Sequence, residues 1–167
     1  MTKPIKCLFS PCRRYRYGWE LIWNNALSPC AFIGLNPSTA DEQGPDPTVR
    51  RCINFARGWG YGRLVMLNLF GFRATDRQAM TRHAAPIAHP SAPRANDQHL
   101  RHTVKRVHHD AGIVIAAWGN DGQHLNRAQA VRTLLASFSL HYLALTKSGE
   151  PGHPLYLKGD LRPISWN

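Results

Sequence analysis

Acidic residues are scarce in this 167-residue chain, which holds 10 Asp and Glu against 21 Lys and Arg, a formal net charge of +11. Such an excess favours polyanionic partners and speeds association with them, although it says nothing about the fold. No apolar run is long enough to span a membrane, and no stretch after the N-terminus resembles a secretion signal. We therefore expect a cytoplasmic protein that does not enter a membrane.

The chain also lacks the cysteine pattern of a metal site. Its four cysteines, Cys7, Cys12, Cys30 and Cys52, include no Cys-x-x-Cys pair, and their intervals match no standard zinc module. The nine histidines show no ligand pattern either. We expect no metal and no cofactor, with Cys30 and Cys52 as small core residues. An iron–sulfur cluster on all four cysteines is the alternative.

Internal repeats and low-complexity segments are absent as well. A chain of 167 residues can bury a core of its own and leaves little room for a second domain. We predict a single monomeric domain over residues 1–167, with an N-terminal extension over 1–28 and a core over 29–157.

Short apolar runs alternate with amphipathic stretches through that core. Runs of strand length span residues 30–35, 64–70, 112–118 and 140–145. Apolar residues recur at helical spacing over residues 46–58, 100–111 and 125–135. Strands alternating with helices indicate parallel strands covered on both faces. We predict an α/β fold, a three-layer α/β/α sandwich around a short parallel sheet of about four strands.

Two segments do not follow this alternation. Residues 5–24 are rich in Tyr and Trp at alternate positions, which predicts a β-hairpin added to the edge of the sheet. Residues 72–93 form a long connection with at most one short helix, near residues 77–82. Long loops in compact domains tend to carry function.

Arginine dominates the basic residues and occurs in clusters, which suits the bidentate recognition of phosphate. No helix shows a strongly apolar face opposite these charges, so nucleic acid is favoured over a membrane surface. The clusters are Arg13, Arg14 and Arg16; Arg50 and Arg51; Arg73 and Arg77; and Arg101, Lys105 and Arg106.

The first core strand ends in Gly34-Leu-Asn-Pro-Ser-Thr, a turn at the place where ligands bind open α/β sheets. Pro37 pushes Asn36 toward an extended conformation, which holds the Asn36 amide at the mouth of the sheet. The alternative is a turn that only ends the strand and caps the next element.

Matching polar residues follow the other strands. Asn68 lies inside an apolar run, where its amide either braces a neighbouring loop or recognises a ligand. Trp118-Gly119-Asn120 ends the third strand, and His153 follows the fourth. A lone loop histidine is more often a surface residue, but the position of His153 in line with Asn36 and Asn68 favours a site.

These motifs resemble, in order and spacing, those of the uracil-DNA glycosylase superfamily over residues 30–157. They are Gly34-Leu-Asn-Pro-Ser, the strand with Asn68, Ala117-Trp-Gly and His153-Pro-Leu. More narrowly, the chain resembles domain-of-unknown-function family 1643. The motifs of that narrower match are Gly-Leu-Asn-Pro-Ser-Thr-Ala-Asp, Asp-Pro-Thr, Trp-Gly-Tyr-Gly, Asn-Leu-Phe, Arg-Ala-Thr and His-Pro-Leu-Tyr.

The wider resemblance implies an enzyme that flips a normal or modified nucleobase out of DNA and hydrolyses its N-glycosidic bond. Asn36 would position the water, although an amide is a poor general base. Asn68 would read the edge of the base, and His153 would donate to the oxygen on which charge develops. Asp41 or Asp46 is a candidate for a nearby carboxylate.

The same resemblance assigns the remaining candidates. Phe55 or Phe70 would cover the base, beside Pro37 and Ser38, and Leu155 or Tyr156 would enter the gap in the base stack. The residues implied to contact nucleic acid are Arg50, Arg73, Arg77 and Lys147.

One departure from the superfamily pattern concerns His153-Pro-Leu-Tyr, which lacks the second proline of the usual His-Pro-Ser-Pro-Leu motif. The segment that would enter the gap in the base stack is therefore shorter or points in another direction. Single-stranded DNA, a modified base or a free nucleotide are alternative substrates. Two other functions stay open: a nucleic-acid-binding module without catalysis, and an enzyme of modified-nucleotide metabolism that uses the same pocket.

Overall fold

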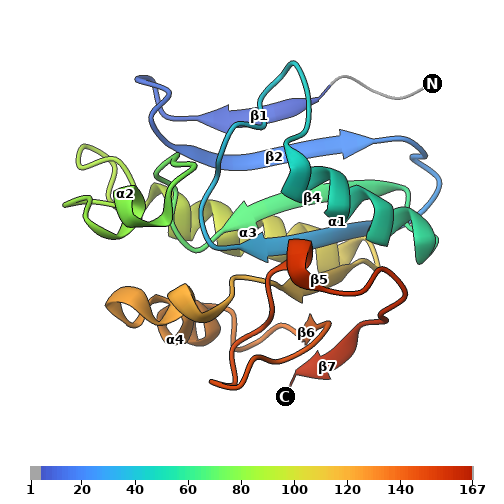
Figure 1. Ribbon diagram of the computed structural model, residues 1–167. Coiled ribbons are helices and arrows are strands. Elements are labelled where there is room, and N and C mark those ends of the chain that lie inside the picture. Colours follow the sequence, from blue (N-terminus) through green and yellow to red (C-terminus); the bar gives the residue numbers. More distant parts are fainter. Residues whose placement is uncertain (1–4, 167) are drawn as a thin grey trace.

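A seven-stranded mixed sheet forms the centre of the protein, which a computed structural model describes over residues 5–166 (Figure 1). The strand order is β1-β2-β4-β3-β5-β6-β7. The strands are β1 (Lys6–Phe9), β2 (Arg16–Ile22), β3 (Pro29–Gly34), β4 (Arg63–Asn68), β5 (Ile113–Ala116), β6 (Leu140–Tyr142) and β7 (Ile164–Trp166). The helices are α1 (Pro47–Gly58), α2 (Arg77–Thr81), α3 (Ala95–His109) and α4 (Arg127–Leu134), with 3₁₀ turns η1 (Asn120–Asn126) and η2 (Pro154–Tyr156).

The predicted α/β class is confirmed, but the sheet is larger than the predicted parallel sheet. β4, β3, β5 and β6 run parallel. The predicted hairpin, β1 and β2, joins the edge of β4 antiparallel, and β7 pairs antiparallel with β6. The sequence did not indicate β7 because three residues, Ile-Ser-Trp, are too few to show a period. Residues 1–4 of the predicted extension and residue 167 lie outside the described part.

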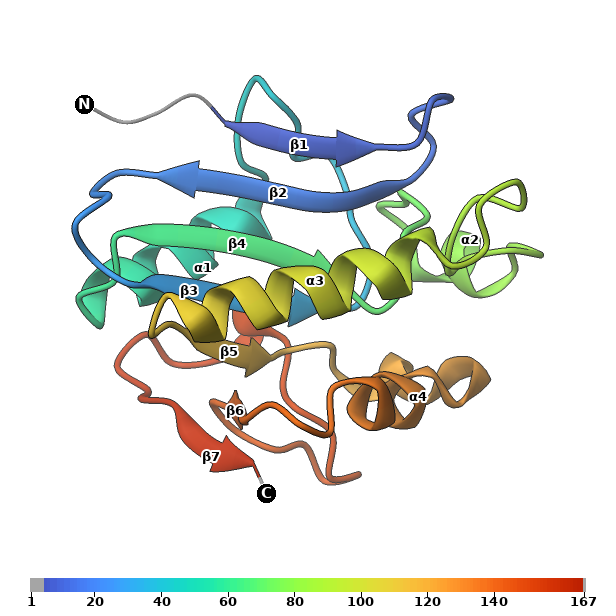
Figure 2. The same cartoon turned by 180° about the vertical axis from the view of Figure 1, so that it is seen from behind.

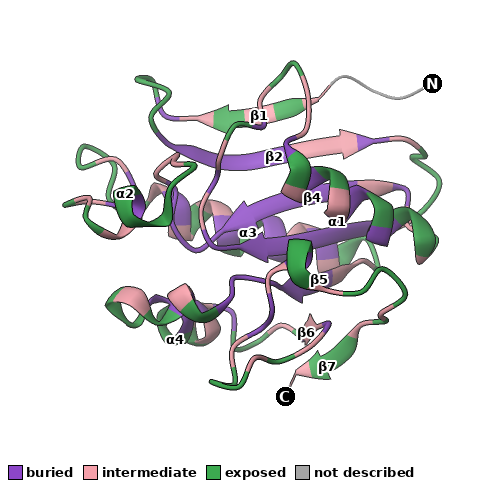
Figure 3. Cartoon of the chain, in the orientation of Figure 1, coloured by how far each residue is buried: buried purple, intermediate pink, exposed green. Residues whose placement is uncertain are grey.

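Helices cover both faces of the sheet, so the domain has three layers (Figures 1 and 2). Successive residues of a strand point to opposite faces, so Cys30 and Phe32 of β3 pack beneath α1, whereas Ala31 and Ile33 pack beneath α3 and α4. β3 is buried along its whole length, and the sheet centre is the most buried part of the molecule (Figure 3).

Helix α1 begins at the predicted position. The Asp46 side chain accepts a hydrogen bond from the backbone N–H of Val49 at 2.9 Å, and Pro47 occupies the first turn. Val49, Ile53 and Ala56 are buried, as the helical spacing predicts. The connection over residues 72–93 contains one short helix, α2, which also agrees with the prediction.

The helical connections that follow β3 and β4 cross opposite faces of the sheet. α1 connects β3 to β4 across one face, and α3 connects β4 to β5 across the other (Figures 1 and 2). β3 therefore lies between the strands reached through these two connections. The connections that leave the carboxyl ends of β3 and β5 therefore run in opposite directions, β3 toward β4 and β5 toward β6. In open α/β sheets, ligands bind at the carboxyl ends of two neighbouring strands whose connections run apart in this way.

None of the helices within residues 5–166 is long and apolar enough to cross a membrane.

Candidate functional site

A cavity of about 730 Å³ opens at the carboxyl ends of the parallel strands. Its walls come from the loops that follow β3, β4, β5 and β6, together with the first turn of α1. The volume is that of a small-molecule pocket, for which about 300–1,000 Å³ is usual. Six of the predicted site residues line it: Asn36, Ser38, Arg77, His153, Leu155 and Tyr156.

The Asn36 side chain is held in one orientation by the loop after β4. Its Nδ2 donates to the backbone oxygens of Ala74 at 2.9 Å and of Pro37 at 3.1 Å. The Ala74 N–H donates to the same Pro37 oxygen at 2.9 Å. Two carbonyl acceptors identify the nitrogen of the amide, so the Oδ1 atom of Asn36 is left as a hydrogen-bond acceptor.

His153 caps the turn η2. Its Nδ1 accepts a hydrogen bond from the backbone N–H of Leu155 at 3.3 Å, so the proton of the neutral ring lies on Nε2. Burial lowers the pKa of His153, an effect that Arg77 adds to and Asp46 opposes. His153 is therefore a neutral donor at neutral pH, and the Tyr156 ring lies 5.5 Å from its own.

Helix α1 and the loop after β5 hold the His153 loop in place. Arg51 of α1 donates to the backbone oxygens of Pro154, at 3.4 Å, and of Leu157. The N–H of Gly119 donates to the Pro151 oxygen at 2.7 Å, and Gly119 has a φ of 71°, which favours glycine. These contacts fix His153 relative to the sheet.

Carboxylates outnumber cations in the cavity wall. Asp46, Asp76 and Asp121 line it, whereas Arg77 is its one Lys or Arg among the described residues. Arg77 is already paired with Asp121 at 2.8 Å. Asp46 and Asp76 accept backbone N–H groups at the starts of α1 and α2. The cavity therefore offers no unpaired cation to a phosphate group.

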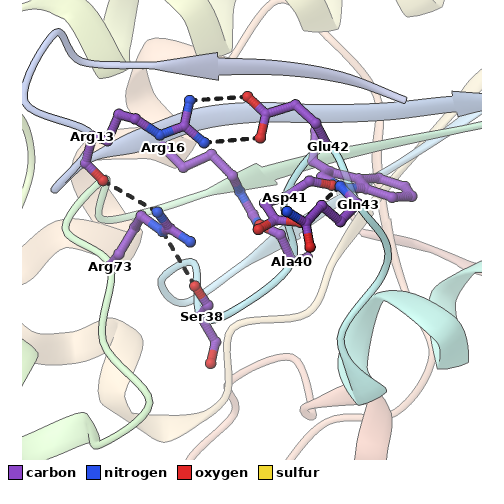
Figure 4. A network of polar contacts seen from close by, with 9 residues as sticks. Arg13, Arg16, Ser38, Ala40, Asp41, Glu42, Gln43 and Arg73 are labelled. Atoms are coloured by element: carbon purple, nitrogen blue, oxygen red, sulfur yellow. Dashed lines mark hydrogen bonds and ion pairs between the residues drawn. The ribbon is translucent and has the colours of Figure 1, made fainter. Parts of the chain in front are cut away.

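The loop between β3 and α1 is attached to the N-terminal hairpin by arginines (Figure 4). Arg13 forms a bidentate ion pair with Glu42, at 2.9 and 2.8 Å. Arg73 donates to the backbone oxygens of Ser38 at 3.4 Å and of Arg13 at 3.2 Å. These contacts tie Ser38 and Glu42 of that loop to the turn between β1 and β2.

Arg16 is a site-supporting residue that the sequence placed only in a basic cluster. It is 1% exposed, and its Nη1 donates to the Ala40 oxygen at 2.6 Å. The N–H of Ala40 in turn donates to Asp46, at 3.3 Å, so the backbone of Ala40 is held through both its N–H and its C=O. Burial lowers the pKa of Arg16 to about 10, and its Nε atom has no hydrogen-bond partner among the described residues.

Asn68 does not line the cavity. Its side chain is 3% exposed and lies against Gly34. If residue 34 carried a Cβ, that atom would lie 3.0 Å from the Oδ1 atom of Asn68. Its Nδ2 has no protein partner among the described residues. The backbone oxygen of Asn68 accepts from the Asn96 side chain at 3.1 Å. Its base-reading role remains a prediction.

The other candidates outside the cavity wall are Pro37, Phe55, Phe70, Arg73, Arg50 and Lys147. Phe55 and Phe70 pack into the cores on opposite faces of the sheet, and Pro37 is buried in its loop. Arg50 and Lys147 are exposed. At the rim of the cavity, Leu155 is 43% exposed and Tyr156 86% exposed.

No three His, Cys, Asp or Glu side chains within residues 5–166 gather closely enough to hold a metal ion. Cys30 of β3 and Cys52 of α1 are buried in the core between α1 and the sheet, Cys7 is half-buried on β1, and Cys12 is exposed. The cysteines are therefore not arranged as cluster ligands.

Residues 16–155 match a family described as a protein of unknown function, DUF1643. The chain belongs to this family. The DUF1643 match begins at Arg16 and ends at Leu155, so it includes the buried arginine and all the cavity-lining residues except Tyr156 and Leu157, whereas β1 and β7 lie outside it. No curated protein and no solved structure matches the chain significantly.

Proposed function

We propose that this DUF1643 protein binds a nucleobase in the cavity and hydrolyses its N-glycosidic bond, as a glycosylase acting on DNA. The observation that carries the proposal is that Asn36 and His153 line the same cavity. Asn36 brings an acceptor, Oδ1, and His153 brings a neutral donor, Nε2–H. Hydrolysis through an oxocarbenium-like sugar needs an acceptor that holds the attacking water on one side of the sugar and a donor to the leaving base on the other.

In the proposed reaction the bond between C1′ and the base nitrogen breaks, and its electron pair leaves with the base. His153 donates a hydrogen bond to the base oxygen on which negative charge develops. A water held by Asn36 Oδ1 adds to C1′, and its proton passes to the departing base or to solvent. Because an amide does not accept this proton, we expect slow turnover.

The charge of the cavity wall supports a base rather than a phosphate as the enclosed group. Asp46, Asp76 and Asp121 repel a phosphate, and Arg77 is paired with Asp121. The base and sugar would enter the cavity, and the flanking phosphates would stay outside. This arrangement suits a nucleotide within a strand.

Tyr156 is the aromatic residue best placed to cover the base or to enter the gap in the stack, because it is exposed at the rim beside His153. Phe55 and Phe70 would have to leave their cores to do so. Leu155, also at the rim, is the second candidate for the wedge.

The test is a panel of DNA oligonucleotides that carry uracil, mismatched bases or modified bases, in single and double strands. We expect abasic sites in at least one substrate, and a loss of about 10²–10³-fold in the rate of base release for His153→Ala, as for removal of a preorganised donor. Asn36→Ala should also reduce the rate. Arg162→Ala, at an exposed position away from the cavity, is the control and should keep full activity.

Binding without base release across the whole panel would contradict catalysis and favour the non-catalytic binding module. Thermal stabilisation by a free nucleotide, without binding to any oligonucleotide, would favour the enzyme of nucleotide metabolism instead.

A further inference from the structure

A stripe of basic side chains runs along the outer face of α3. Arg94, just before the helix, and Arg101 and Lys105 within it are exposed, as is Gln98 between them. Their spacing of four, three and four residues places them on one side of the helix. At a rise of about 1.5 Å per residue, the stripe from Arg94 to Lys105 is roughly 16 Å long.

These cations are not neutralised by the protein. Among the described residues, no hydrogen bond or ion pair involves the side chain of Arg94, Arg101 or Lys105. By contrast, the neighbouring Arg106 pairs with Glu20 at 2.9 Å.

The acidic groups packed around α3 are already engaged by other cations. Arg127 binds Asp97, and Arg63 lies 3.7 Å from Asp110 and 3.5 Å from Glu20. The stripe therefore presents positive charge to solvent.

The stripe begins at the edge of the sheet where the cavity opens. Asn96, in the first turn of α3, donates to the backbone oxygens of Asn68 and Leu69 at the carboxyl end of β4. From there α3 runs back across the face opposite α1, starting beside α2 (Figure 2). A nucleic-acid strand that leaves the cavity over this edge of the sheet would reach Arg94 first and Lys105 last.

Of the arginines predicted to bind phosphate near the cavity, Arg73 and Arg77 are less available than the stripe, whereas Arg50 is exposed like it. Arg77 is bound to Asp121, and Arg73 donates to two backbone oxygens. We propose that Arg94, Arg101 and Lys105 bind the phosphate backbone of the nucleic-acid strand that flanks the base in the cavity. This inference rests on the proposed function for the identity of the strand. One strand carries a charge about every 3.4 Å along a duplex axis, so the stripe spans several phosphates.

The test measures binding of a labelled single-stranded oligonucleotide of mixed sequence by fluorescence anisotropy across a salt series. The double variant Arg101→Ala/Lys105→Ala removes two contacts. We expect weaker binding, and a slope of log K against log salt that is shallower by about 1.4, or about 0.7 for each phosphate contact. Both positions are exposed and helical, where alanine is favourable, and a circular dichroism melt verifies folding.

Lys158→Ala/Arg162→Ala is the matched control, because it removes the same charge from exposed positions outside the stripe. It should leave the slope within about 0.3 of the wild-type value if the contacts are local. Equal losses in both double variants would show diffuse attraction to a basic protein and overturn the proposal.

The outcomes separate this inference from the proposed function. Unchanged oligonucleotide binding in Arg101→Ala/Lys105→Ala, together with base release by the wild type, overturns the stripe alone. A selective loss of binding in that variant, without base release from any substrate, supports the stripe and counts against the glycosylase. Wild-type protein that binds polyglutamate or anionic vesicles but no oligonucleotide overturns nucleic acid as the occupant.

Discussion

His99 of α3 is half-buried, and its ring packs on β2 where residue 18 is a glycine. A Cβ at Gly18 would lie 2.5 Å from the Nε2 atom of His99, and Thr103 Oγ1 lies 3.4 Å from that nitrogen. Burial lowers the pKa of His99 to about 4, an effect that Arg106 and His102 add to and that Glu20 opposes.

We therefore expect the protein to lose stability in acid through His99. Below a pH of about 6.5 the unfolded imidazole binds a proton, whereas the folded one stays neutral until the pH approaches 4. The stabilising contribution is present above the unfolded pKa and is lost as the pH falls through this window. It amounts to up to about 3 kcal/mol of unfolding free energy.

Urea denaturation at about pH 7 and about pH 4.5 measures this effect. His99→Gln should lose less stability than the wild type between the two conditions. His109→Gln is the control, because the His109 side chain is 87% exposed. An equal pH dependence in His99→Gln and the wild type would contradict the assignment.

At the scale of elements, the N-terminal hairpin organises the loop between β3 and α1. Arg16 of β2 holds Ala40 from one side and Asp46 holds it from the other. Within residues 5–166 no carboxylate forms an ion pair with Arg16, and a buried charge without such a partner is costly, so we expect Arg16 to serve mainly to hold the loop.

We expect Arg16→Met to lower the unfolding free energy by no more than about 1–3 kcal/mol, because the buried charge is removed but the Ala40 oxygen loses its donor. The same change should raise amide hydrogen exchange at residues 39–45, because the Ala40 anchor is lost. Arg13→Ala is the comparison: it removes an exposed ion pair with Glu42, which water screens, and should leave the unfolding free energy nearly unchanged. Unchanged amide hydrogen exchange at residues 39–45 in Arg16→Met would show that the loop keeps its conformation without Arg16.

Sequence patterns predicted the helices and strands better than they predicted the contacts between those elements. The hairpin, α1 and the short α2 could be predicted because each depends on residues close together in the chain. β7 could not, because three residues carry no period and their pairing with β6 is decided by distant parts of the chain. The pairing of Arg77 with Asp121 is likewise not visible in the sequence.

At the scale of the whole molecule, the two cores share the same strands. Ala31 and Ile33 pack on one face and Cys30 and Phe32 on the other, so neither core can be lost without exposing β3. Such sharing favours a single cooperative unfolding transition.

Truncation on either face should therefore destabilise the whole domain. Leu100→Ala in α3 and Ile53→Ala in α1 should each lower the unfolding free energy by about 2–5 kcal/mol, the usual cost of a buried cavity. Transitions followed by circular dichroism and by tryptophan fluorescence should coincide, because Trp19 and Trp118 lie in the two cores. Separate transitions in either variant would refute a shared core.

The sequence by itself determined the α/β class, the hairpin and the polar turns at the strand ends, because these follow from local periodicity and from proline and glycine chemistry. Only the tertiary structure decided which of those polar residues share a cavity. Asn36 and His153 both line it, whereas Asn68, one strand away from Asn36, lies buried beside Gly34. The difference arises because side-chain direction depends on strand register and loop anchoring, which bring together residues far apart in the chain.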